Sequence, residues 1–171
     1  KKEEYPTSFA QARMCLASQL YEDDNSYNVP LAFLAPEDLD ICKLQDVLQQ
    51  IIEKQHVLRT TFVETEKGFK QKILDDLYIR LHIDAEISKN EILSEIKSFV
   101  RPYCFEEGEL LWRWKLLRIK EDKRVLVIFD FHHSIFDGTS INIFINSVQN
   151  GFEDKEIAIP EVQFVQYVEW E

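Results

Sequence analysis

The sequence predicts an α/β fold in which a mixed β-sheet packs against several helices. Apolar residues recur at helical spacing in some stretches and alternate with polar ones in others, so helices and strands follow each other along the chain. Residues 125–131 are apolar at nearly every position, which indicates a strand covered on both faces. With 171 residues, 45% apolar and 12% aromatic, the chain can bury one substantial core. We therefore expect one domain, with no internal repeat.

Composition excludes several classes of partner. The net charge of −11 and the isoelectric point near 4.9 argue against nucleic acid and anionic membranes, which would repel the chain. The three cysteines Cys15, Cys42 and Cys104 lack metal-type spacing and indicate reduced thiols. No apolar run is long enough to span a bilayer, and no signal peptide opens the chain. We expect a cytoplasmic protein.

The first half of the chain predicts two helices and three strands. Ser8 caps a helix whose apolar residues share one face, namely Phe9, Ala12, Leu16 and Leu20. A short strand at 31–34 precedes the longest amphipathic helix, which begins at Asp38 or Asp40, ends near residues 54–56 and buries its stripe in the core. Residues 58–63 form the next strand, and a hairpin turn at 66–68 leads into a strand at 69–74.

The second half continues the same alternation. Residues 77–83 alternate apolar and polar, as in a strand with one solvated face. Residues 88–91 form a capping box that opens a helix, and Pro102 stops it. The strand at 110–119 pairs with 124–131 through a turn at 121–123, and an apolar-rich helix follows Pro160.

The buried strand ends in two adjacent histidines, His132 and His133. Neighbouring residues of a strand point to opposite faces, so only one of the two can face a given cavity. Asp137 and Gly138 favour a tight turn, since glycine is free to take a positive φ. Thr139 or Ser140 then caps a helix that closes at residues 150–151. Titratable groups facing a helix N-terminus could handle a developing oxyanion.

Other chemistries fit the same residues less well. A lone histidine at a strand end is usually structural. His133 and Asp137 lie four residues apart, a spacing that gathers metal ligands only on a helix, and no third ligand is near in sequence. We expect no metal site. A nucleophilic Cys15 or Cys104 paired with His133 stays open as a minor alternative.

Residues 132–138 fit the His-His-x-x-x-Asp-Gly signature of the condensation domains of nonribosomal peptide synthetases. Residues 8–13 resemble the family's Ser-x-Ala-Gln-x-Arg pattern, 26–30 its Ser-Tyr-Asn-Val-Pro, and 164–170 its Tyr-x-Asp-Tyr-Ala-x-Trp. Only the second half of Arg-His-Glu-x-Leu-Arg-Thr-x-Phe is intact, because the first three residues are replaced by Lys54, Gln55 and His56. Lysine lacks the bidentate fork of arginine, which puts a carboxylate pairing at that place in doubt.

The resemblance covers the whole chain and implies the fold of a chloramphenicol-acetyltransferase-like lobe. Residues 1–171 would be the N-terminal lobe of a condensation domain, whose active-site tunnel lies between two lobes. The implied reaction is amide-bond formation between donor and acceptor thioesters on carrier proteins. His133 would accept or orient the amine proton, and the N–H of Gly138 would help hold the oxyanion. His132 would be structural, and Asp137 would fix the loop through a buried cation, either Arg13 or Arg59.

The resemblance also implies partners. The lobe would need no cofactor of its own, because phosphopantetheine arrives on the carrier proteins. The missing C-terminal lobe and an adenylation domain of the same synthetase would complete the assembly. We expect the isolated lobe to be inactive and to expose an apolar face beside His133. Three alternatives remain: an epimerization domain, a coenzyme-A-dependent acyltransferase of the same fold, and a non-catalytic docking module.

Overall fold

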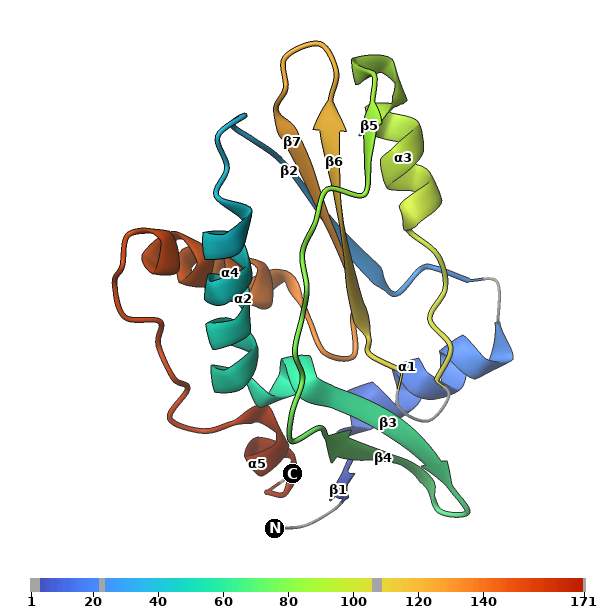
Figure 1. Cartoon of the computed structure of the whole chain (residues 1–171). Helices are drawn as coiled ribbons and strands as arrows, with labels where there is room; N and C mark the ends of the chain where they lie inside the picture. Colours follow the sequence, from blue (N-terminus) through green and yellow to red (C-terminus); the bar gives the residue numbers. More distant parts are fainter. Residues whose placement is uncertain (1–3, 22–23, 106–108, 171) are drawn as a thin grey trace.

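The computed structural model describes residues 4–21, 24–105 and 109–170, and these form two sheets with helices around them (Figure 1). The larger sheet has the order β2 (Asn28–Ala35), β7 (Val125–His132), β6 (Trp112–Ile119) and β5 (Ala85–Ile87). Only the β5–β6 pair is parallel, so the predicted mixed sheet is confirmed. A second, antiparallel sheet of β1 (Tyr5–Pro6), β4 (Gly68–Ile73) and β3 (Thr60–Thr65) was not expected.

Five α-helices surround the sheets in the described part of the chain. They are α1 (Phe9–Leu20), α2 (Ile41–Lys54), α3 (Ile92–Phe99), α4 (Gly138–Phe152) and α5 (Phe164–Val168). Two short 3₁₀ turns, η1 (His56–Arg59) and η2 (Lys89–Glu91), precede β3 and α3. Helices α2 and α4 cover one face of the larger sheet and α3 covers the other (Figure 1).

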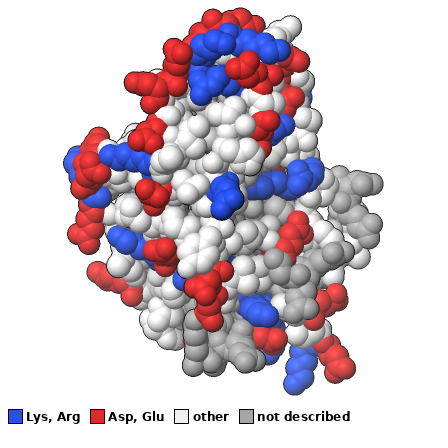
Figure 2. Space-filling view, in the orientation of Figure 1, with Lys and Arg blue, Asp and Glu red and all other residues white. Residues whose placement is uncertain are grey.

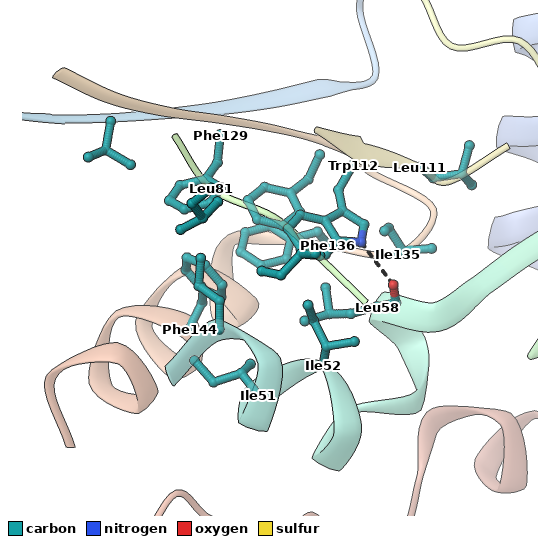
Figure 3. Packing of buried hydrophobic residues seen from close by; sticks show 14 of the residues in the cluster. Ile51, Ile52, Leu58, Leu81, Leu111, Trp112, Phe129, Ile135, Phe136 and Phe144 are labelled. Atoms are coloured by element: carbon teal, nitrogen blue, oxygen red, sulfur yellow. Dashed lines mark hydrogen bonds between the residues drawn. The ribbon is translucent and has the colours of Figure 1, made fainter. Parts of the chain in front are cut away.

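The central strand is β7, and all eight of its residues are buried, as its apolar run predicted. Phe129 and Phe131 face the core under α2 and α4, whereas Leu126 and Ile128 face α3. The Trp112 ring stacks on Phe131 with centroids 5.8 Å apart, and its indole N–H donates to the carbonyl of Leu58 at 2.8 Å (Figure 3). This aromatic packing fixes the end of β7 from which the histidines emerge.

The caps of three helices follow the sequence. Ser8 and Gln11 form a reciprocal capping box on α1, and Asp40 caps α2. The expected capping box at 88–91 is present and opens η2 and α3. The apolar face predicted for α1 is not part of the core, since Phe9, Leu16 and Leu20 are 81%, 53% and 68% exposed. Gln11 and Cys15 are the buried residues of that helix instead.

Two predicted strands differ in the structure. Residues 58–59 belong to η1, so the strand begins at Thr60. Residues 77–83 are extended, with Ile79 and Leu81 buried as the alternation predicts, but they pair with no strand in the described chain. Side chains of α2 take the place of a neighbouring strand, since Gln45 accepts from the N–H of Leu81 at 2.9 Å and Gln49 accepts from that of Ile79 at 3.3 Å.

Charged residues of both signs mix over the face shown in Figure 2 and gather most densely at its upper end. That end holds the β6–β7 turn, where Asp122 pairs with Lys89 at 3.0 Å and with Arg124 at 2.8 Å. No helix in the described part of the chain combines the length and apolar character that crossing a bilayer requires.

Candidate active site

The chain reverses direction just after β7, earlier than the sequence suggested. The N–H of Ile135 donates to the carbonyl of His132 at 3.0 Å, which closes a turn over residues 133–135. Gly138 does not have a positive φ and is the first residue of α4. The expected Asp-Gly turn is therefore wrong, because the bend is complete before Asp137 and these two residues start the helix.

His132 is 2% exposed and packed among aromatic rings. The rings of Tyr27, Tyr103 and Phe105 lie with centroids 5.9, 5.7 and 4.9 Å from its imidazole. Its Nδ1 accepts from the N–H of Ser134 at 3.2 Å. The proton of a neutral ring is then on Nε2, which lies 3.2 Å from the hydroxyl of Ser18. Burial lowers the pKa of His132 to about 4, so the ring is neutral at pH 7.

His133 points the other way and is exposed. Its backbone N–H donates to the carbonyl of Tyr27 at 2.7 Å, which ties the first residue after β7 to the residue before β2. The side chain lines a cavity of about 390 Å³. The cavity is also lined by Ser8, Ala10, Gln11, Met14, Val57, Ser134, Ile135, Phe136, Asp137, Ser140 and Phe164. The expected separation of the two histidines onto opposite sides is found.

Asp137 is the N-cap of α4, a role the sequence assigned to Thr139 or Ser140. Its Oδ1 accepts from the backbone N–H of Ser140 at 2.8 Å and from the Ser140 hydroxyl at 2.7 Å. These bonds lower the pKa of the Asp137 carboxyl. The carboxylate is exposed.

The expected buried cation beside Asp137 is absent from the described residues. Arg13 is exposed on α1, and it forms no ion pair with Asp137 in the part of the chain that the structure describes. Arg59 is buried and directs its guanidinium to backbone carbonyls, including that of Ile52 at 3.1 Å and that of Leu74. Arg59 therefore holds the end of α2 against the segment after β4, and the described residues form no ion pair between Asp137 and either arginine.

Gly138 lies exposed at the start of α4, and a Cβ added there would meet nothing within 4 Å. A substrate atom could therefore come close to the backbone at this position. The first N–H groups of a helix have no partner within the helix and attract negative charge. An oxyanion role for the Gly138 N–H stays a prediction.

Sequence reasoning missed Gln11 as a member of the site. It is 2% exposed, and its amide nitrogen donates to the carbonyl of Ser134 at 3.1 Å and to the side-chain oxygen of Gln71 at 3.0 Å. Its own side-chain oxygen accepts from the N–H of Ser8 at 3.0 Å. The sequence shows Gln11 three residues after a serine, which is the spacing of a capping box. It does not show the hydrogen bond from the Gln11 amide to the carbonyl of Ser134, because these residues are 123 positions apart.

The structure does not support a nucleophilic Cys15. Cys15 is fully buried, and burial raises the pKa of its thiol to about 12, so it carries no thiolate at neutral pH. Within the described residues, no group of three or more metal-ligating side chains comes together. Lys54, at the altered part of the family pattern, donates to the carbonyl of Ile157 at 2.8 Å rather than to a carboxylate.

Comparison with known proteins identifies the fold and the family. The condensation-domain family model matches residues 1–171. Surfactin synthase subunit 2 of Bacillus subtilis (strain 168) is 34% identical over 171 residues, which are 100% of this chain and 5% of that protein. Bacitracin synthase 1 of Bacillus licheniformis is 33% identical over 178 residues, 99% of this chain and 3% of that protein.

Solved structures agree on the fold. In the complex of the X-domain and OxyB from teicoplanin biosynthesis, the matching chain has a TM-score of 0.88 at 20% identity, over 99% of this chain and 38% of that one. A four-domain nonribosomal peptide synthetase bound to AMP and glycine gives a TM-score of 0.81 at 19% identity, over 98% of this chain and 13% of that one. The chain spans a small fraction of the relatives that it matches. It belongs to the condensation-domain family of nonribosomal peptide synthetases.

Proposed function

We propose that this chain is the N-terminal lobe of a condensation domain and supplies the histidine motif for amide-bond formation between carrier-bound thioesters. The observation that carries the proposal is the difference between the environments of the two histidine side chains. His132 is buried with both ring nitrogens engaged, whereas His133 lines a cavity of about 390 Å³ at the start of α4. A reactive imidazole needs that access, together with a fixed backbone.

In the proposed reaction, the acceptor amine attacks the carbonyl carbon of the donor thioester. His133 accepts or orients the proton that the amine loses as the C–N bond forms. Negative charge develops on the carbonyl oxygen and is stabilised by N–H groups at the start of α4, with that of Gly138 as the candidate. Collapse of the tetrahedral species breaks the C–S bond, and the departing thiolate takes up the proton that the amine has lost. Asp137 keeps α4 capped while this happens.

The cavity needs a cover. Phe164, which lines the cavity, is 39% exposed, and the adjoining hollows expose further apolar side chains. Ile143 lines one of them and is 52% exposed, and Tyr167 and Trp170 line another beside Phe164 and are 54% and 74% exposed. Contiguous exposed apolar surface usually marks an interaction site. In this proposal the second lobe of the domain covers this surface, carrier proteins deliver substrates on phosphopantetheine, and an adenylation domain loads them in the cytoplasm. The 171-residue chain alone is expected to have no turnover.

The test uses a polypeptide that contains this chain and a second lobe, supplied with loaded donor and acceptor carriers. His133→Ala should lower the rate of dipeptidyl-thioester formation by about 10²–10⁴-fold, the usual contribution of general acid–base assistance. His82→Ala is the matched control, because the His82 side chain is 70% exposed, pairs with Asp84 at 3.2 Å and is outside the cavity. Turnover by His133→Ala close to that of wild type would refute the catalytic role.

The same assay separates the alternatives. Exchange of the Cα proton of a carrier-bound aminoacyl group into D₂O, without dipeptide formation, would identify an epimerization domain. Acyl transfer from coenzyme A would identify an acyltransferase of the same fold. Binding of carriers without any chemistry, in wild type and His133→Ala alike, would identify a docking module.

A further inference from the structure

A buried ion pair joins β7 to β6 just before the histidines. Asp130 is fully buried two positions before His132, and so on the same face of the strand. Its cross-strand neighbours are Pro30 on β2 and Arg113 on β6. The Arg113 side chain is 13% exposed. Neither residue was singled out from the sequence, and the catalytic proposal does not use them.

The pair is part of a closed set of contacts. The Oδ2 atom of Asp130 accepts from Arg113 Nε at 3.2 Å and from the side-chain amide of Asn28 at 2.7 Å. The guanidinium carbon of Arg113 lies 3.8 Å from the centre of the Tyr103 ring. The Tyr103 hydroxyl donates to the backbone carbonyl of Asp130 at 2.6 Å, which closes the set. Arg113 also donates to the carbonyl of Arg101, so the segment after α3 is held as well.

Stability alone does not account for this arrangement. Burial raises the pKa of Asp130, and the bond from Asn28 and the charge of Arg113 oppose that shift. Its Oδ1 atom is buried and has no hydrogen-bond partner in the described part of the chain. Replacing a buried ion pair by apolar residues of similar size is often neutral or stabilising. A half-satisfied buried carboxylate therefore suggests a role beyond packing.

The contacts of the pair lead directly to both histidines. The Tyr103 ring, held by Arg113 and by Asp130, packs edge-on against the His132 ring at 5.7 Å. Asn28 follows Tyr27, whose carbonyl accepts the N–H of His133. The Asn28–Asp130 bond therefore lies beside the bond that sets where His133 leaves the sheet. Arg113 also helps to lower the pKa of His132.

We propose that Arg113 and Asp130 are positioning residues for the histidine motif. They hold β2 and β7 together at the point where His133 leaves the sheet, and they keep the Tyr103 ring against His132. Neither touches the cavity that His133 lines. The effect on turnover rests on the proposed function, whereas the effect on the histidines can be measured without it.

The primary test is hydrogen exchange and imidazole NMR on the chain itself. In Asp130→Asn and Arg113→Lys, the His133 amide should exchange at least tenfold faster than in wild type, and the ring nitrogen signals of His132 should shift. Amides in the middle of β7 should keep their wild-type rates. A merely structural role would accelerate all of β7 together, because those amides would open only by unfolding of the strand.

Glu95→Gln is the matched control. It removes the ion pair between Glu95 and Lys115, which lies on the same strand as Arg113 and has an N–O distance of 2.8 Å. The His133 amide should keep its wild-type rate in this variant. If a single change at Asp130 prevents folding, Asp130→Leu combined with Arg113→Met leaves no uncompensated buried charge and should fold. It should show the same selective loss of protection at His133.

The second arm uses the two-lobe polypeptide. Asp130→Asn should lower kcat at least tenfold with the KM for the acceptor carrier within twofold of wild type, because the chemistry and not the docking is disturbed. Unchanged exchange at His133 in both Asp130→Asn and the double variant would overturn the inference. If His133→Ala keeps full turnover, the proposed function fails, and the exchange experiment still decides the positioning role.

Discussion

The helix cap at Asp137 gives a sharp test of how the motif aspartate acts in this chain. If its role is the cap seen in the structure, Asp137→Asn should change the free energy of unfolding by only a few tenths of a kcal/mol, because asparagine caps helices about as well as aspartate. Asp137→Ala removes the acceptor for the N–H and hydroxyl of Ser140, at 2.8 and 2.7 Å. It should cost about 1 kcal/mol, or about 2–4 °C in melting temperature for a chain of this size.

Urea denaturation followed by circular dichroism measures these differences, and Asp40→Ala is the internal standard. Asp40 caps α2 by accepting from the N–H of Lys43 at 2.9 Å, so its loss should cost a similar amount. A partner in a buried ion pair behaves differently, since removing it leaves an uncompensated charge and costs about 3–5 kcal/mol. A loss of 3 kcal/mol or more in Asp137→Asn would refute the cap and restore the buried-cation explanation.

The pH dependence of the cap has a definite sign. Hydrogen bonds from the Ser140 side chain and backbone lower the pKa of Asp137 in the folded chain. The stability that they contribute is therefore complete above the pKa of the unfolded carboxyl, about 3.9, and is lost as the pH falls through the lower folded value. The difference between wild type and Asp137→Ala should be constant from pH 5 to 8 and shrink below about pH 4.

Three further predictions concern other positions. Because burial lowers the pKa of His132 to about 4, its neutral ring contributes stability above pH of about 6.5 that is lost progressively towards pH 4, and His132→Phe should remove this part of the pH dependence in denaturation curves. Gly151→Ala should destabilise by about 1–3 kcal/mol, since the new Cβ would lie 2.5 Å from a methyl of Val47, whereas Gly138→Ala, with nothing within 4 Å, should not destabilise. Cys15 should resist iodoacetamide at pH 8 in the native chain while the two exposed cysteines react, and equal labelling of all three in mass spectra would contradict its burial.

Much of the fold followed from local patterns that tertiary contacts reinforce. The run at 125–131 predicted β7 because a strand with two covered faces is apolar at nearly every position. The caps at Ser8 and Asp40 followed from side chains that bond within three residues of themselves. Alternation at 77–83 correctly predicted an extended, half-buried segment and wrongly predicted strand pairing, because alternation reports burial and not the identity of the hydrogen-bond partner.

The site was predictable in its location and less so in its contacts. Adjacent strand residues must diverge, so one accessible and one buried histidine followed from His132 and His133 alone. The sequence alone could not identify the partners of Asp137, because a carboxylate can accept hydrogen bonds from nearby N–H groups of a helix or pair with an arginine that is distant in sequence. Asp130 was hidden for a related reason, since its partners come from β2 and β6 and only the sheet order brings them together.

The attachment of residues 77–83 to α2 has a consequence for how this lobe can change over evolutionary time. A strand paired through backbone atoms tolerates almost any substitution in its neighbour, because every residue type except proline carries the same N–H and C=O groups. Here the acceptors are the side-chain oxygens of Gln45 and Gln49, so these hydrogen bonds depend on the residue type at two individual positions. A substitution at either position would remove one of these two hydrogen bonds while leaving the helix itself intact.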